Sequence, residues 1–215
     1  MAAAGIVLAG GRSSRMGTAK AGLEWEGSTL LARTLDVLRV GLDGPLLVVR
    51  SAGQGLPDLP GPVDVVDDPR PGRGPVQGLA AGLAAVADRA TSAFVCATDL
   101  PFLHPAFVRS VVMALEAPAD PETEVALPVV GGRAHPLTAA YRTSLAEVAD
   151  AAVVEGRLRL TAFVEGCRVR RLDEAVLLSD RELAAVDPGL ASVTNLNTPQ
   201  DLSRARARAR AASRG

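Results

Sequence analysis

The sequence predicts an α/β fold in which a mostly parallel β-sheet is covered by helices on both faces, giving three layers. Short continuous apolar runs, such as 5–9 and 93–97, alternate along the chain with segments whose leucines recur at helical spacing. Strands that alternate with helices are joined by crossovers, which make neighbouring strands parallel. Aromatic residues make up only 3% of the chain, and this suits helices packed on a sheet better than an aromatic-rich β-sandwich.

Length and composition indicate a single well-packed domain. The chain has 215 residues, of which 48% are hydrophobic, and it shows no internal repeat and no linker. We therefore predict one domain over residues 1–215, with a tail that frays from about residue 205. The 23 Lys and Arg residues nearly balance the 24 Asp and Glu residues, so a net charge of -1 gives no long-range field to attract nucleic acid or an acidic membrane.

In the first half of the chain, apolar runs predict strands and periodic leucines predict helices. The run at 5–9 ends at Gly10-Gly11 and has the continuous apolar character of a strand buried on both faces. Ser28 is the candidate N-cap of the helix that follows. The expected elements are a strand at 5–9, a helix at 28–40, strands at 46–49 and 63–66, a helix at 77–87 and a strand at 93–97.

In the second half, the pattern changes to β-like runs that lie close together. The runs at 125–130 and 137–141 are joined through Gly131-Gly132 and predict a small antiparallel excursion from the main sheet. The segment Thr198-Pro199-Gln200-Asp201 provides an N-cap, a proline at the first helical position and an acid three residues after the cap, so a helix begins there. Helices at 144–155 and 160–164 and a strand at 168–172 complete the expected elements.

The cysteines and the N-terminal segment bear on the location of the protein. Cys96 and Cys167 lie far apart and form no CxxC pair, which excludes a zinc knuckle and a disulfide framework, so both are expected to be reduced. The N-terminal segment has no basic residue before its apolar run, and that run ends at Ala9. We therefore expect no signal peptide, no membrane-spanning helix and a cytoplasmic location.

The segment 8–20, LAGGRSSRMGTAK, has the residue types of a phosphate-binding loop. Glycines that follow a buried strand let backbone N–H groups approach a ligand closely, and Arg15 and Lys20 can offset the charge of phosphates. Five residues separate Gly11 from Gly17, which excludes a Walker loop, and no GxGxxG follows the first strand, which excludes the dinucleotide-binding pattern. A glycine turn with solvated cations is the alternative.

Asp99 directly follows the strand expected at 93–97, where the carboxyl edge of a parallel sheet presents ligand-binding groups. Mg²⁺ prefers hard oxygen ligands and keeps its other positions for water and phosphate oxygens, so one carboxylate is enough to hold it. The alternative is that Asp99 caps the helix that Pro105 opens. Asp68 follows another strand, and it could equally be a turn acid before Pro69.

Several short motifs follow one another in an order that resembles a known family. They are the segment 8–20, Asp67-Asp68-Pro69, Gly74-Pro75-Val76-Gln77-Gly78, Thr98-Asp99-Leu100-Pro101, His135-Pro136 and Thr194-Asn195-Leu196-Asn197-Thr198-Pro199. Together they resemble the MobA-like NTP transferases, the nucleotidyltransferase family typified by the molybdenum cofactor guanylyltransferase. The resemblance implies a single-domain Rossmann-like fold of the NTP-transferase type. It also implies Mg²⁺-dependent transfer of GMP from GTP to the phosphate of molybdenum-molybdopterin, with release of pyrophosphate.

The resemblance assigns roles to the residues that match its motifs. The nucleotide would be held by the backbone of Leu8, Ala9, Gly10 and Gly11, and its phosphates would be contacted by Arg15 and Lys20. Asp68 would bind the ribose or base, and Asp99 would bind the metal and the nucleotide. The acceptor side would be formed by His135, Asn195 and Asn197. Transfer onto an ionised phosphate needs no general base, so His135 is not expected to be one. The family's base-contacting Asn has no counterpart at 49–51, where the chain has Val-Arg-Ser.

Three alternatives remain open for the function of the protein. They are a related transferase that uses CTP, one that uses another phosphorylated acceptor, and a nucleotide-binding protein without activity. Relatives that favour CTP usually have Ala in place of Gly10; without a Cβ the loop lets the larger purine approach the backbone, so the chain matches the guanine users.

Partners follow from the same resemblance. They are GTP and the molybdopterin acceptor, together with molybdoenzymes or cofactor-insertion proteins. The basic run Arg204, Arg206, Arg208 and Arg210 fits a solvated helix end better than a nucleic-acid site, because no aromatic residue interleaves with it. We expect neither nucleic acid nor a membrane as a partner.

Overall fold

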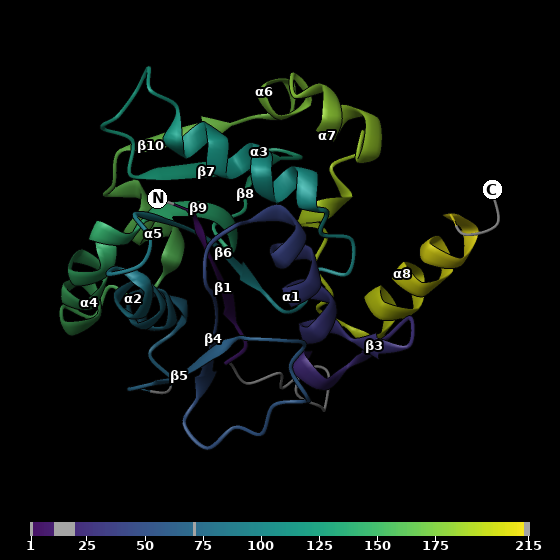
Figure 1. The fold of residues 1–215 in the computed structure, drawn as a ribbon, viewed down its shortest axis with the longest axis horizontal. Helices are drawn as coiled ribbons and strands as arrows, with labels where there is room; N and C mark the ends of the chain where they lie inside the picture. The colour runs from purple at the N-terminus through teal and green to yellow at the C-terminus, as the bar shows by residue number, and fades with distance from the viewer. Residues whose placement is uncertain (1, 11–19, 71, 213–215) are drawn as a thin grey trace.

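The computed structural model describes residues 2–10, 20–70 and 72–212 and has one large sheet between two layers of helices (Figure 1). The strand order is β10-β7-β9-β6-β1-β4-β5, and β8 pairs with β7 beside this path. Every pairing in this order is parallel except those of β9 with β6 and β7. The strands are β1 (Ala4–Leu8), β4 (Leu46–Ser51), β5 (Asp64–Asp68), β6 (Ser92–Ala97), β7 (Val125–Val130), β8 (Arg133–Ala134), β9 (Thr138–Arg142) and β10 (Val169–Leu172). The predicted fold class is confirmed.

The helices form separate layers on the two faces of the sheet (Figure 1). One layer contains α1 (Leu30–Gly41), α3 (Pro105–Glu116), α6 (Glu174–Leu178) and α7 (Arg181–Val186), and the other contains α2 (Pro75–Val86), α4 (Ala146–Val154) and α5 (Leu160–Glu165). Along β1, Val7 belongs to the core under the first layer whereas Ile6 belongs to the core under the second. Because adjacent residues of a strand face opposite sides, a strand covered on both faces must be apolar throughout.

The cap of α1 lies one residue later than predicted. The hydroxyl of Thr29 accepts a hydrogen bond from the N–H of Ala32 at 3.1 Å, whereas Ser28 pairs with Trp25. These two residues belong to a small antiparallel sheet of β2 (Glu24–Trp25) and β3 (Ser28–Thr29). The hairpin carries extended backbone as far as Thr29, so the second of two adjacent hydroxyl residues becomes the cap.

The location predicted for the antiparallel excursion is wrong. The runs at 125–130 and 137–141 form β7 and β9, and both belong to the main sheet, where β9 lies between β6 and β7. Only β8, at the tip of the connection, lies beside the path of the sheet. The first four residues of both β7 and β9 are buried, so these strands need neighbours and helical cover on both sides.

The C-terminal helix α8 (Pro199–Ala212) begins as predicted and continues to Ala212. The hydroxyl of Thr198 accepts from the N–H of Asp201 at 3.1 Å, and the Asp201 carboxylate accepts from the N–H of Thr198 at 2.9 Å, which is a reciprocal capping arrangement. Beyond that cap, Ala205 and Ala209 are buried in a cluster with Trp25. This contact holds the helix against the small sheet.

Membrane-spanning elements are missing from the described ranges. No helix within residues 2–10, 20–70 and 72–212 is long and apolar enough to cross a bilayer.

Candidate functional site

The carboxyl ends of β1 and β6 place two of the predicted site segments side by side. These strands are parallel neighbours, and Leu8 at the end of β1 lies opposite Ala97 at the end of β6. The segment of Ala9 and Gly10 therefore leaves the same edge of the sheet as the segment that carries Asp99. The crevice at this edge is the usual ligand-binding position of an open parallel sheet.

Asp99 is buried at this edge, with 6% of its surface exposed. The alternative that it caps α3 is wrong, because His104 is the N-cap and its ring Nδ1 accepts from the N–H of Ala106 at 3.2 Å. The carbonyl oxygen of Asp99 accepts from the N–H of Leu196 at 2.9 Å. A segment almost one hundred residues away is thus held against the predicted metal ligand.

The Leu196 contact brings Asn195 and Asn197 to the same region. Leu196 is buried, while the asparagines on either side of it are exposed. The buried leucine anchors the segment in the cluster of Trp25 and α8, and this leaves the two amides at the surface beside Asp99. The structure therefore brings the segment 195–197 next to Asp99.

Two backbone N–H groups directly after β1 already donate hydrogen bonds within the protein. The N–H groups of Ala9 and Gly10 both donate to the carbonyl of Val49 on β4, at 2.8 Å and 3.3 Å. A nucleotide held by the backbone of residues 8–10 would therefore be bound mainly through carbonyl oxygens. These accept from a base edge but repel phosphate, so this segment suits the nucleoside better than the triphosphate.

Gln54 stands beside this backbone and was not identified from the sequence. Its amide nitrogen donates to the carbonyl of Ala9 at 3.0 Å, and its amide oxygen accepts from the N–H of Ser51 at 3.1 Å. The side chain reaches back because residues 51–54 form a tight turn in which the N–H of Gln54 donates to Ser51 at 2.9 Å and Gly53 has a φ of 75°. An amide therefore stands near the end of β4 although no Asn is present at 49–51.

Asp68 lies at the far end of this edge, on β5. It is opposite Ser51, and β1 and β4 separate its strand from β6, so Asp68 and Asp99 do not form one metal site. Its carboxylate accepts from the N–H of Arg70 at 2.9 Å, as the turn-acid alternative requires. A carboxylate has acceptor capacity beyond one such bond, so a contact with the nucleoside is still available.

The segment at 74–78 forms the start of α2, beside the end of β1. Gly74 is the N-cap with a φ of 76°, and no side chain caps the helix. A Cβ on Gly78 would lie 3.4 Å from the side chain of Leu8, so the helix packs closely on β1 at this point.

His135 lies between β8 and β9 and is half-buried. Its N–H donates to the carbonyl of Pro128 at 2.9 Å, and its ring Nε2 lies 3.4 Å from the carbonyl of Val130. Burial lowers the pKa of the imidazole, and the hydrogen bond to Val130 only partly opposes this effect. The neutral form therefore dominates near pH 7, and His135 supplies no fixed positive charge there.

We expect His135 to reduce stability in mildly acidic solution. The unfolded chain binds the proton with an ordinary pKa of about 6.5, whereas the folded pKa is lower, so the free energy of unfolding falls as the pH decreases through this range. His135→Gln does not titrate and should lose less stability between about pH 7.5 and about pH 5 in urea titrations. An identical pH dependence of the two proteins would contradict this expectation.

Two of the predicted nucleotide-binding residues, Gly11 and Arg15, lie outside the described residues. Lys20 is the first residue of the short helix η1 (Lys20–Gly22), and its side chain also lies outside what the structure describes. Within the described part of the chain, no three His, Cys, Asp or Glu residues gather as a metal cluster.

The cysteines do not contribute reactive groups to this edge. Cys96 on β6 and Cys167 are both free thiols. Burial raises the pKa of the Cys96 thiol, and it raises the pKa of Cys167 to about 11. Both thiols are therefore protonated near neutral pH and are poor nucleophiles.

Known proteins resemble the chain in sequence over almost its whole length. The MobA-like NTP transferase domain family matches residues 5–173. A probable molybdenum cofactor guanylyltransferase of Mycobacterium tuberculosis (strain H37Rv) is 38% identical over 206 residues, covering 94% of both chains. One of Mycobacterium avium (strain 104) is 39% identical over 215 residues, covering 98% of both.

Solved structures share the fold at lower identity. Molybdopterin-guanine dinucleotide biosynthesis protein A from Archaeoglobus fulgidus matches with a TM-score of 0.73 and 23% identity, over 94% of this chain and 96% of that one. The 2-C-methyl-D-erythritol 4-phosphate cytidylyltransferase of Thermus thermophilus matches with a TM-score of 0.59 and 22% identity, over 95% and 98%. The sequence match over most of the chain decides the family: the protein belongs to the MobA-like NTP transferases and is a nucleotidyltransferase.

Proposed function

We propose that the protein is a Mg²⁺-dependent guanylyltransferase that moves GMP from GTP to the phosphate of molybdenum-molybdopterin and releases pyrophosphate. The observation that carries this proposal is the meeting of the Ala9-Gly10 backbone, buried Asp99 and the segment 195–197 at one edge of the sheet. The names of the relatives supply the choice of substrates.

Asp99 fits a magnesium ion by its chemistry. It is a hard oxygen ligand at the edge where strands present ligands, and Mg²⁺ commonly takes one or two carboxylates with phosphate and water oxygens completing six positions. When bound, the ion would neutralise the charge that develops on the transferring phosphoryl group. Asp99 is the residue that would hold it.

The other residues would bind and orient the two substrates. The backbone of residues 8–11 and the side chain of Asp68 would bind the nucleotide, while Arg15 and Lys20 would offset the charge of its phosphates. Asn195, Asn197 and His135 would hold the acceptor, whose ionised phosphate attacks without a general base. Catalysis in this scheme is positioning and charge neutralisation.

The proposal also covers the location of the protein, its domain organisation and its partners. The chain would act in the cytoplasm as one catalytic domain, and it would pass its product to molybdoenzymes or cofactor-insertion proteins.

A panel of GTP, ATP, CTP and UTP with molybdopterin tests the function directly. We expect GTP to exceed CTP by at least about tenfold in kcat/KM, which corresponds to roughly 1.4 kcal/mol of transition-state binding. Nucleotide transfer would be measured by pyrophosphate release and by chromatography of the product. Equal or better use of CTP would reject the guanylyltransferase assignment, and transfer from none of the four nucleotides would reject molybdopterin as the acceptor.

A further inference from the structure

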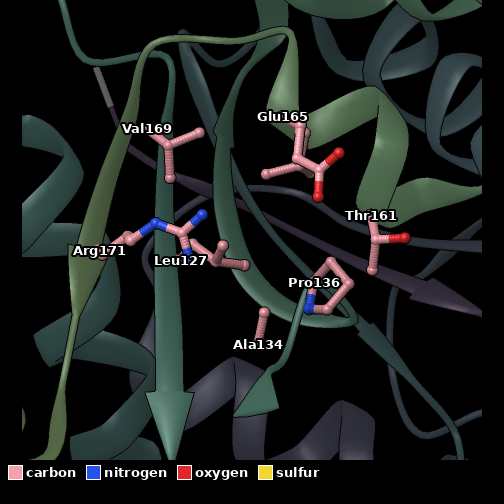
Figure 2. Close-up of a pocket in the computed structure, with 8 residues that line it drawn as sticks. Leu127, Ala134, Pro136, Thr161, Glu165, Val169 and Arg171 are labelled. Carbon is pink, nitrogen blue, oxygen red and sulfur yellow. The ribbon is translucent and has the colours of Figure 1, made fainter. Parts of the chain in front are cut away.

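A small pocket lies between α5, β7 and β10, on the face of the sheet that also carries α2 (Figure 2). Its volume is about 100 Å³. Pockets that enclose a whole ligand typically measure roughly 300–1,000 Å³, so this one fits a single end of a molecule. Most of its lining is apolar: Leu127, Ala134, Pro136, Val164 and Val169.

Two side chains of opposite charge reach into this pocket from opposite sides. The guanidinium of Arg171 enters from β10, and Glu165, the last residue of α5, stands across from it with Thr161 nearby (Figure 2). Among the residues that the structure describes, neither charged side chain forms a hydrogen bond or an ion pair. By contrast, the nearby Arg168 is paired with Glu124 at 3.1 Å. The two charges in the pocket are therefore available to a ligand.

The two groups select a particular kind of ring edge. A guanidinium only donates hydrogen bonds and a carboxylate only accepts them. A 2-amino-4-oxopyrimidine ring complements both, because its amino group and ring N–H donate side by side while its carbonyl and ring nitrogens accept. The apolar lining suits the faces of a flat ring. Pterins and guanine both carry this edge.

The position of the pocket distinguishes these two sources. β9 separates β7 from β6, so at about 4.8 Å per strand the pocket lies roughly 10 Å to one side of β6, while β1 with Ala9 and Gly10 lies on its other side. The N–H of Ala97 donates to the carbonyl of Leu137 at 3.3 Å, which places Pro136 of the pocket close to the strand that leads to Asp99. The pocket is thus next to the site but away from the nucleoside segment.

The pocket lies on the same face of the sheet as the start of α2. A Cβ on Gly74 would lie only 3.0 Å from the carbonyl oxygen of Leu158, so the loop before α5 touches the start of α2. The helix that borders the pocket is therefore a direct neighbour of the helix that begins beside the end of β1.

We propose that this pocket binds the pterin ring of the acceptor, with the Glu165 carboxylate on its amino-pyrimidinone edge and the Arg171 guanidinium on its carbonyl and ring nitrogens. This inference rests on the proposed function, which makes the acceptor a phosphorylated pterin. The phosphate would extend toward Asp99, and the guanine of GTP would stay at β1 and α2.

The test uses 6-hydroxymethylpterin, a fluorescent pterin without phosphate, titrated against the full-length protein. Glu165→Gln and Arg171→Ala should each weaken its binding by at least about tenfold and raise the KM for molybdopterin by a similar factor, with the KM for GTP unchanged. Glu147→Gln and Arg181→Ala are matched controls, because both residues are exposed and lie outside the pocket. Thermal unfolding checks that all four variants fold.

The possible outcomes test the pterin pocket and the guanylyltransferase assignment separately. Unchanged pterin binding in both pocket variants would overturn the inference, and so would a rise in the KM for GTP alone, which would assign the pocket to guanine. A protein that binds the pterin through Glu165 and Arg171 but transfers no GMP would support the pocket and reject the guanylyltransferase assignment.

Discussion

Asp99→Asn should lower nucleotide transfer by at least about 100-fold while the protein stays folded. The side chain is only 6% exposed and stands at the carboxyl edge of β6, beside the end of β1. Asparagine keeps its size and shape but removes the negative charge that a divalent cation requires. The loss should appear in kcat/KM at saturating Mg²⁺, measured by pyrophosphate release.

The control for this variant is Asp43→Asn, which removes the same charge from an exposed position between α1 and β4. It should transfer nucleotide at the rate of the unaltered protein. Thermal unfolding should show that Asp99→Asn is folded at the assay temperature, so that the loss of transfer reports on the site. Near-normal transfer by Asp99→Asn at saturating Mg²⁺ would show that this carboxylate does not hold the metal.

The layers of the fold could be predicted because a strand that is buried on both faces has a continuous apolar sequence. β1 and residues 93–97 of β6 are apolar, and α1 and α3 show leucines or valines at helical spacing. The place of β9 could not be predicted in this way. A buried antiparallel strand has the same apolar character as a buried parallel one, and its neighbours are fixed by pairing between residues such as Cys96 and Thr138 that are far apart in the chain.

The site was predictable to the extent that it follows strand ends and short motifs. Asp99 and the segment 195–197 meet because the Leu196 N–H bonds to Asp99, and both segments carry residues of the motif order. Gln54 was missed because its role depends on a turn that folds its side chain back over Ala9. The signal for it was the sequence Ser-Ala-Gly-Gln directly after a buried strand, where glycine permits a tight turn.

The other large effect is expected from Gly10→Ala, which should reduce kcat/KM with GTP by about tenfold and narrow the preference for GTP over CTP. The structure changes the physical reason for this expectation. A Cβ at residue 10 would point toward the end of β4, where it would lie 3.2 Å from both the backbone nitrogen and the hydroxyl of Ser51. The methyl group would therefore press against Ser51 rather than against a bound base. To make room for it, β1 and β4 must move apart by a few tenths of an ångström at this edge.

That movement would disturb the contacts that fix the nucleoside segment. The N–H groups of Ala9 and Gly10 both bond to Val49, and Gln54 joins Ala9 to Ser51, so displacement of Ser51 shifts the carbonyls that would contact the base. Gly55→Ala is the matched control, since a Cβ there meets no atom within 4 Å and the residue has no positive φ. Steady-state kinetics with GTP and CTP would measure the ratio for each variant. Equal ratios in Gly10→Ala and Gly55→Ala would mean that the Gly10–Ser51 contact does not set the choice of base.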